Sequence, residues 1–286
     1  MLRTWNKSFD GLSSAGLLAC VVLLGGFWNG EAATGQVLDP QQKDWIAKYE
    51  KQENAPDPGK MLLNKDAEPD LSAGFTSLFN GNDLDGWEPK GGNCSFEVKE
   101  GQIVGTCVPG SNSTYLCTKK SDYSDFIFTC ELKWEVDGNT GIQFRSKSRQ
   151  GEKSKKKKRA ISDDNSKANE PIPETVYGPQ VEMEGLGKGD RHWSGGIYGQ
   201  SCGGYFYPLW LQEHKAARAA EKPDQWNRVT ISAKGNVIKT WINGVPVAHW
   251  VDDGTYSSGF FGLQIHKGKA GQVLFRNIKV KELNKQ

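Results

Sequence analysis

Short segments in which apolar and polar residues alternate recur along the chain from Phe75 to Val280, about every 10 to 15 residues. The stretch Phe126–Val136 shows the pattern well, with apolar residues on one parity and charged residues between them. Turns with glycine separate the segments, and Asn243-Gly244 is the strongest short hairpin signal. No strong helical pattern lies between them. The sequence therefore predicts an all-β sandwich of two antiparallel sheets over about 73–286.

The composition agrees with a β-rich globular chain and excludes other classes. Among 286 residues there are 34 Gly, 12 Pro and only 3 Met, which argues against a helical bundle. The mean hydropathy of -0.62, with a single long apolar stretch, excludes a polytopic membrane protein. The 36 Lys+Arg and 34 Asp+Glu give a net charge of +2, too balanced for a domain that binds nucleic acid through phosphate contacts.

The first 32 residues have the order of features found in a secretory signal peptide. Arg3 and Lys7 precede an apolar run, Leu12–Trp28, and small residues follow at Gly30 and Ala32. We therefore expect export to the periplasm or outside the cell, with no stable membrane span after cleavage. The alternative is an uncleaved N-terminal membrane anchor, because the run is nearly long enough to span a bilayer.

Export would permit disulfide bonds. Removal of residues 1–32 leaves five cysteines: Cys94, Cys107, Cys117, Cys130 and Cys202. Because five is odd, at least one thiol stays free or pairs between chains. The first four lie close together on neighbouring predicted strands, so one or two bridges among them are plausible. The chain has no Cys-x-x-Cys motif, which argues against a structural zinc site.

Two segments depart from the strand pattern. Residues 33–72 form a leader in which Gln41–Lys51 has the apolar spacing of one short helix, and we expect this leader to be a loose tether. Residues 147–170 form an insertion loop that contains the basic run Lys153–Arg159. A solvated loop is favoured over a polyanion site, because no aromatic residues interleave for base stacking.

Polar side chains recur at strand spacing in three separate segments. Residues i and i+2 of a strand share a face, which groups Gln143 with Arg145, Gln180 with Glu182 and Glu184, and Gln264 with His266. Each group alone fits a solvated outer face. Together they hold amides, carboxylates, a guanidinium and an imidazole, which bind sugar hydroxyls and move protons. Trp193 and Tyr198, beside a glycine-rich turn, would suit stacking on a sugar ring, or they are core residues.

Several motifs together resemble the 3-keto-disaccharide hydrolase family. The match runs from about 75 to 283 and includes the opening Leu78–Trp87, Gly141–Arg145, Tyr177–Gln180 with Glu182, Gly195–Tyr198, Trp226-Asn227, Asn243-Gly244, Gly262–His266 and the ending Phe275–Val280. The resemblance implies a concanavalin A-like jelly roll, export, and 3-keto-glucoside 1,2-lyase or 3-keto-2-hydroxyglucal hydratase activity. It also implies a partner enzyme that oxidises C3 of the sugar. The chain departs from the family pattern at Thr140 and Pro179, and in its lysine-rich loop.

The implied chemistry assigns roles to these residues. His266 is the expected base, with Glu182 as the second candidate, and Arg145 would stabilise the enolate oxygen. The side chains expected to hold the substrate are Gln143, Gln180, Gln264, Tyr177, Trp193 and Tyr198. The cofactor is left open; a divalent metal held by Glu182, Glu184 and His266 could replace Arg145, although nothing in their spacing demands it.

Two alternatives stay open at this point. A retaining glucanase would need two carboxylates about 5–5.5 Å apart, for which Glu182 and Glu184 are the candidates. Such an enzyme would carry an acidic residue at the position of Gln180, and an amide is a poor nucleophile. A non-catalytic carbohydrate-binding module would bind sugar through aromatic and amide side chains alone.

Overall fold

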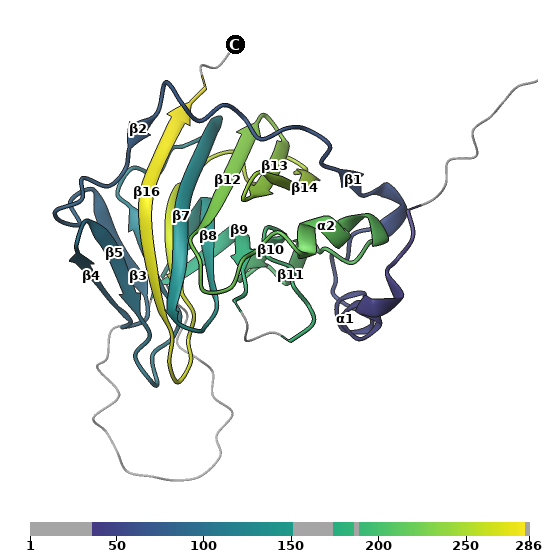
Figure 1. Cartoon of the computed structure of the whole chain (residues 1–286), viewed down its shortest axis with the longest axis horizontal. Helices are drawn as coiled ribbons and strands as arrows, with labels where there is room; N and C mark the ends of the chain where they lie inside the picture. The colour runs from purple at the N-terminus through teal and green to yellow at the C-terminus, as the bar shows by residue number, and fades with distance from the viewer. Residues whose placement is uncertain (1–35, 151–173, 186–188, 284–286) are drawn as a thin grey trace, which may run out of the picture. The chain divides into compact units, whose positions relative to one another are not determined.

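The computed structural model describes residues 36–150, 174–185 and 189–283. The expected signal peptide at 1–32 and most of the lysine-rich insertion at 147–170 lie outside the described residues. The described chain is an all-β sandwich of two antiparallel sheets, which confirms the predicted fold class (Figure 1). None of the helices in these ranges is both long enough and apolar enough to cross a membrane.

The larger sheet has nine strands. Along the sheet they are β1 (Leu62–Leu63), β14 (Val245–Val251), β13 (Val237–Ile242), β12 (Asn227–Lys234), β7 (Phe126–Val136), β16 (Gln272–Glu282), β5 (Gln102–Thr106) and β4 (Ser95–Lys99), with β2 (Thr76–Ser77) beside β16. The two longest strands, β7 and β16, pair at its centre (Figure 1).

The smaller sheet has seven strands and carries most of the polar segments noted in the sequence. Their order is β11 (Gly204–Tyr207), β10 (Ile197–Gln200), β9 (Thr175–Met183), β8 (Thr140–Arg149), β15 (Phe260–Ile265), β6 (Thr114–Thr118) and β3 (Trp87–Gly91). The described helical segments are short: η1 (Pro40–Gln42), α1 (Lys43–Tyr49), η2 (Pro58–Lys60), η4 (Gln212–His214) and α2 (Lys215–Arg218).

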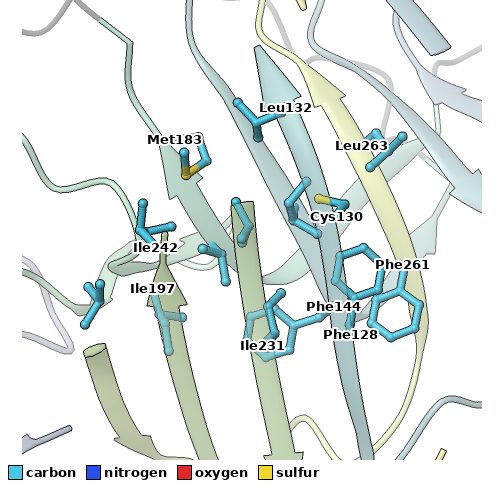
Figure 2. Close-up of a cluster of buried hydrophobic side chains, with 14 of the residues drawn as sticks. Phe128, Cys130, Leu132, Phe144, Met183, Ile197, Ile231, Ile242, Phe261 and Leu263 are labelled. Atoms are coloured by element: carbon cyan, nitrogen blue, oxygen red, sulfur yellow. The ribbon is translucent and has the colours of Figure 1, made fainter. Parts of the chain in front are cut away.

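The core lies between the sheets and follows from the alternation along each strand. Phe128, Cys130 and Leu132 of β7 are fully buried, whereas Glu131 between them lies on the outer face and pairs with Arg276. Phe261 of β15 stacks on Phe128 with ring centroids 4.5 Å apart. Figure 2 shows these side chains meeting from the two layers.

The leader packs on the sandwich more closely than a loose tether would. The short helix expected within 41–51 is present as α1. The buried side chain of Gln42 accepts a hydrogen bond from Nε1 of Trp193 at 2.8 Å. Gln52 donates to the carbonyl of Tyr205 (2.6 Å) and accepts from its backbone N–H (2.9 Å). Gln52 thus covers part of the open edge of β11, where a neighbouring strand would otherwise pair.

Of the bridges considered from the sequence, none is formed in the structure. The five cysteines of the described chain are free thiols, and four of them are buried. Cys117 lies on β6 in the smaller sheet and Cys130 on β7 in the larger one, in separate clusters of buried side chains.

Replacing Phe261 by Ala should destabilise the sandwich, because the ring fills the centre of the core between both sheets. Loss of a buried phenyl ring costs about 3–5 kcal/mol of the free energy of unfolding. Urea unfolding followed by tryptophan fluorescence would measure it. The control Val237→Ala removes a side chain that is 37% exposed and should cost less than about 1 kcal/mol. Equal losses in the two variants would contradict this placement of the core.

Candidate functional site

A cleft of about 570 Å³ lies against the seven-stranded sheet, on the face turned away from the core. Val181 and Met183 of β9 point into the core, so Gln180 and Glu182 point outward into the cleft. The other strands supply further polar or aromatic side chains to the cleft: Tyr115 from β6, Tyr198 and Gln200 from β10, Tyr205 from β11, and Gln264 from β15.

A chain of amide side chains forms the floor of the cleft. Nε2 of Gln143 donates to Oε1 of Gln180 (2.5 Å), and Nε2 of Gln180 donates to Oε2 of Glu182 (2.7 Å). Nε2 of Gln180 also lies 3.3 Å from Oε1 of Gln264, whose own amide donates to the hydroxyl of Tyr115 at 3.2 Å. Because these buried groups satisfy one another, each is held in one orientation.

Gly141 makes room for this arrangement. It lies opposite Glu182 in the β8–β9 ladder. A Cβ atom at position 141 would lie only 2.4 Å from Nε2 of Gln180, closer than two atoms can pack. The glycine is thus required because the Gln180 amide lies directly over the β8 backbone on its way to Glu182.

Glu182 is a buried carboxyl group on the lining of the cleft. Its side chain accepts hydrogen bonds from Nδ2 of Asn139 (2.7 Å) and from Gln180. Burial and, to a smaller extent, the charge of nearby Glu184 raise the pKa of Glu182 to about 7, against the opposing effects of Asn139, Arg191 and Gln180. Near neutral pH this group exists in both protonation states, as a general acid or base requires.

His266 lies at the rim of the same cleft, directly after β15. Its backbone N–H contacts the carbonyl of Asn139 (3.3 Å), the same residue whose side chain binds Glu182. Its ring Nδ1 lies 2.7 Å from the carbonyl of Lys267, which favours the tautomer with the proton on Nδ1. The structure thus places His266 and Glu182 on the lining of the same cleft.

Arg145 does not join them, and its predicted role at the enolate is wrong. A β-bulge between Gln143 and Lys147 inserts one extra residue into β8, and Arg145 adopts a positive φ of 46°. Arg145 is 1% exposed, and its guanidinium pairs with Asp125 at 3.1 Å and donates to the carbonyls of Ser124 and Gly235. The simple i, i+2 rule fails at the bulge, so Arg145 holds loops together away from the cleft.

The other predicted contacts divide into two groups. Tyr198, Gln180 and Gln264 line the cleft. Gln143 lies beneath it, fully buried, and acts only through Gln180. Trp193 is fully buried and bound to Gln42, which makes it a packing residue. Tyr177 lies outside the cleft lining, with the guanidinium of Arg149 over its ring.

Glu184 supports the wall of the cleft instead of lining it. Its carboxylate forms a buried salt bridge with Arg191 and accepts from the Tyr205 hydroxyl (3.2 Å) and the Trp193 backbone N–H (3.1 Å). Arg191 in turn donates to the hydroxyl of Tyr49 at 2.7 Å. Both Arg191 and Tyr49 line the cleft, so the leader helix α1 contributes one wall.

The three possible metal ligands proposed from the sequence do not gather. Glu184 is occupied by Arg191, Tyr205 and Trp193 and does not line the cleft that holds Glu182 and His266. No group of three or more His, Cys, Asp or Glu side chains placed to hold a metal occurs in the described ranges.

The sequence reasoning missed several cleft residues. Gln200 follows Tyr198 at i+2, so the strand rule applied to β10 would have found it. Arg191 and Asn139 lie in loops, where no periodicity indicates which way a side chain points. Tyr49 lies on the short leader helix, whose apolar spacing does not show which part of the sandwich the helix packs on.

Comparison with known proteins agrees with this fold. The sequence model of the family described as "3-keto-alpha-glucoside-1,2-lyase-like domain" matches residues 74–281. A search of curated proteins found no match.

Three solved structures that are similar to this chain share little sequence with it. A protein of unknown function with a galectin-like fold from Bacillus subtilis is 13% identical, with a TM-score of 0.50, over 77% of this chain and all of that one. A candidate glycosyl hydrolase from Parabacteroides distasonis is 22% identical, with a TM-score of 0.45, over 74% of this chain and 94% of that one. A carbohydrate-binding module from Bacillus subtilis is 15% identical, with a TM-score of 0.42, over 68% and 95%. The galectin-like match agrees with the predicted concanavalin A-like sandwich.

Replacing Glu182 by Gln should remove a pH-dependent loss of stability. The folded-state pKa is raised to about 7 from 4.5, so the folded protein binds this proton more tightly than the unfolded chain. The stability gained from the neutral carboxyl is complete below about pH 4.5 and is lost as the pH rises through about 7. Across that range the wild type should lose about 3 kcal/mol relative to Glu182→Gln.

Urea unfolding at a series of pH values would measure this difference. The control Glu97→Gln changes an exposed carboxylate on β4 and should show no such trend. A difference between the wild type and Glu182→Gln that stays constant from pH 4.5 to 7 would contradict the raised pKa.

Proposed function

Because the chain belongs to the 3-keto-alpha-glucoside-1,2-lyase-like domain family, we propose that its cleft binds a 3-keto-glycoside and cleaves the bond between C1 and the glycosidic oxygen. Family membership supports a carbohydrate-related function. The observation that carries the finer proposal is the buried carboxyl of Glu182, with a pKa of about 7, inside a sugar-sized cleft lined by amides and hydroxyls.

The chemistry needs one base and one acid. The C3 ketone acidifies the hydrogen on C2, because the carbanion left behind is an enolate. The ionised Glu182 takes this proton, the electron pair forms the C1–C2 double bond, and the glycosidic oxygen leaves from C1 and is protonated. The products are an unsaturated 3-keto sugar and an alcohol, and addition of water to the double bond would complete a net hydrolysis. General acid–base groups of this kind accelerate such steps about 10²- to 10⁴-fold each.

The other cleft residues take supporting roles in this proposal. His266 at the rim takes a proton from solvent on its ring and passes it to the leaving oxygen as the bond between C1 and that oxygen breaks. Burial raises the pKa of the Tyr115 phenol above its ordinary value, so the hydroxyl stays protonated and can donate to the enolate oxygen. Gln180 and Gln264 hold sugar hydroxyls, and Arg191 provides the cationic side chain that Arg145 does not.

Two wider expectations belong to the same proposal. The substrate carries a ketone that ordinary glycosides lack, so an oxidoreductase acting on C3 must supply it. The N-terminal 32 residues favour export, and the protein would then act in the periplasm or outside the cell.

The two alternatives predict different behaviour. A retaining glucanase requires a second carboxylate facing Glu182, and Glu184 is committed to the salt bridge with Arg191. A carbohydrate-binding module would bind the sugar in the same cleft without forming product. The raised pKa of Glu182 would also suit the general acid of a glucanase, so what opposes that enzyme is the engagement of Glu184 with Arg191. A binding module has no use for a carboxyl group of raised pKa.

Replacing Glu182 by Gln should reduce kcat/KM for a 3-keto-glucoside about 10²- to 10⁴-fold, because an amide cannot accept the C2 proton. Release of the alcohol would be followed by chromatography, and the unoxidised glucoside would be tested in parallel. In the wild type kcat/KM should rise with pH through about 7, as Glu182 ionises. Exchange of the C2 hydrogen with deuterated water should also be lost in this variant.

Glu97→Gln serves as the matched control and should keep full activity, because Glu97 is exposed on the other sheet. Full activity in Glu182→Gln would remove the proposed base. Binding without any turnover by the wild type would favour the binding module, and turnover of the unoxidised glucoside would favour the glucanase.

A further inference from the structure

Two cysteines lie opposite each other at the open end of the β4–β5 hairpin. The ladder pairs Lys99 with Gln102 at the turn and ends with Ser95 opposite Thr106. One step beyond this last pair, the same register places Cys94 opposite Cys107. The two residues are 13 positions apart in the sequence, yet they are direct neighbours across the hairpin.

The hairpin turn decides which kind of pair they form. Glu100 and Gly101 both have positive φ values, 49° and 72°, as in a two-residue type I′ turn, which is closed by a hydrogen-bonded pair. Hydrogen-bonded and non-hydrogen-bonded pairs alternate along the ladder. Counting outward from the turn, the sixth pair, Cys94 with Cys107, is non-hydrogen-bonded.

The backbone bonds of both residues agree with this count. The N–H of Cys107 donates to the carbonyl of Gly271 on its other side (2.8 Å), and the N–H of Cys94 donates to Oγ1 of Thr114 (2.9 Å). Cα atoms of a non-hydrogen-bonded pair lie about 4.5 Å apart, with the side chains at their closest. That separation falls within the range of about 4.4–6.8 Å that a disulfide spans.

The two thiols contact each other in a buried setting. Each residue is 6% exposed. Burial raises the pKa of the Cys107 thiol, and the neighbouring Cys94 thiol raises it further. The other cysteines of the described chain are placed differently: Cys117 and Cys130 lie on different sheets, and Cys202 lies at the β10–β11 turn.

We propose that Cys94 and Cys107 form a disulfide when the protein meets a disulfide oxidant such as oxidised glutathione. One protein thiolate attacks the oxidant, releases one glutathione thiolate and forms a mixed disulfide. The second protein thiolate attacks the protein sulfur, forms the Sγ–Sγ bond and releases the second glutathione. The protein loses two protons and two electrons, and both electrons are carried by the two glutathione thiols. β4 is an edge strand, so fraying of the hairpin end gives the oxidant access.

This bond would lie directly beside the cleft. The segment 92–94 lies alongside residues 111–114. The Gly92 N–H donates to the carbonyl of Ser113 (3.0 Å), and the Cys94 N–H donates to Oγ1 of Thr114 (2.9 Å). Gly91, Asn112 and Ser113 line the cleft. The disulfide therefore closes a loop of about 14 residues whose open end supports one rim of the cleft.

A peptide map of the wild-type protein tests the proposal without any variant. The full chain is reduced, then incubated with oxidised glutathione at about pH 8.5, where thiolates form more readily. Free thiols are alkylated, and the protein is digested with trypsin without reduction. Cleavage after Lys90, Lys99 and Lys119 should give peptides 91–99 and 100–119 joined, two hydrogens lighter than their sum. Fragmentation distinguishes Cys107 from Cys117 within the second peptide.

Thermal unfolding supplies the second measurement. Oxidation should raise the Tm of the wild type by about 5–10 °C, and the rise should disappear in the double variant Cys94→Ala/Cys107→Ala. Cys202→Ala, a matched control at the half-exposed cysteine, should keep the rise. Recovery of both peptides as alkylated monomers or glutathione adducts, or a crosslink through another cysteine, would overturn the proposal. An equal Tm rise in the double variant would overturn it as well.

Discussion

The buried carboxyl of Glu182 is the constraint on which the arrangement of the cleft depends. A carboxyl removed from water is costly to ionise unless polar groups are fixed around it. Here Asn139 and Gln180 supply those groups, and Gln180 is itself held by Gln143 from below. The result is a group that neither stays fully ionised nor stays fully protonated at neutral pH, with its pKa near 7.

The sandwich fold places these polar side chains on the face of the seven-stranded sheet that is turned away from the core. One face of the seven-stranded sheet packs on the core, and the other carries the amides, the phenols and Glu182. Because residue 141 is glycine, no Cβ atom occupies the space that the Gln180 amide takes. Fold and site are therefore linked through the same strands, because β9 gives Val181 to the core and Glu182 to the cleft.

Strand periodicity predicts much of this from the sequence. Alternation correctly gave the two-sheet fold and placed Gln180, Glu182 and Gln264 on one face. It failed at Arg145, because the bulge in β8 changes the parity and a single sequence does not show where an extra residue is inserted. It also could not place Trp193, whose burial depends on Gln42 from a distant segment.

The leader contributes one wall of the cleft, and this wall lies outside the residues that match the family. The family match begins at residue 74, whereas Tyr49 of α1 lines the cleft and holds Arg191. The wall of the cleft that α1 provides therefore lies outside the part of the chain that matches the family.

The most direct test of the account is a crystal structure of Glu182→Gln soaked with a 3-keto-glucoside. The account predicts the sugar over Gln180 and Gln264, with C2 within about 3.5 Å of the side chain at position 182; a sugar bound on the nine-stranded sheet, or with C2 turned away from that side chain, would contradict it.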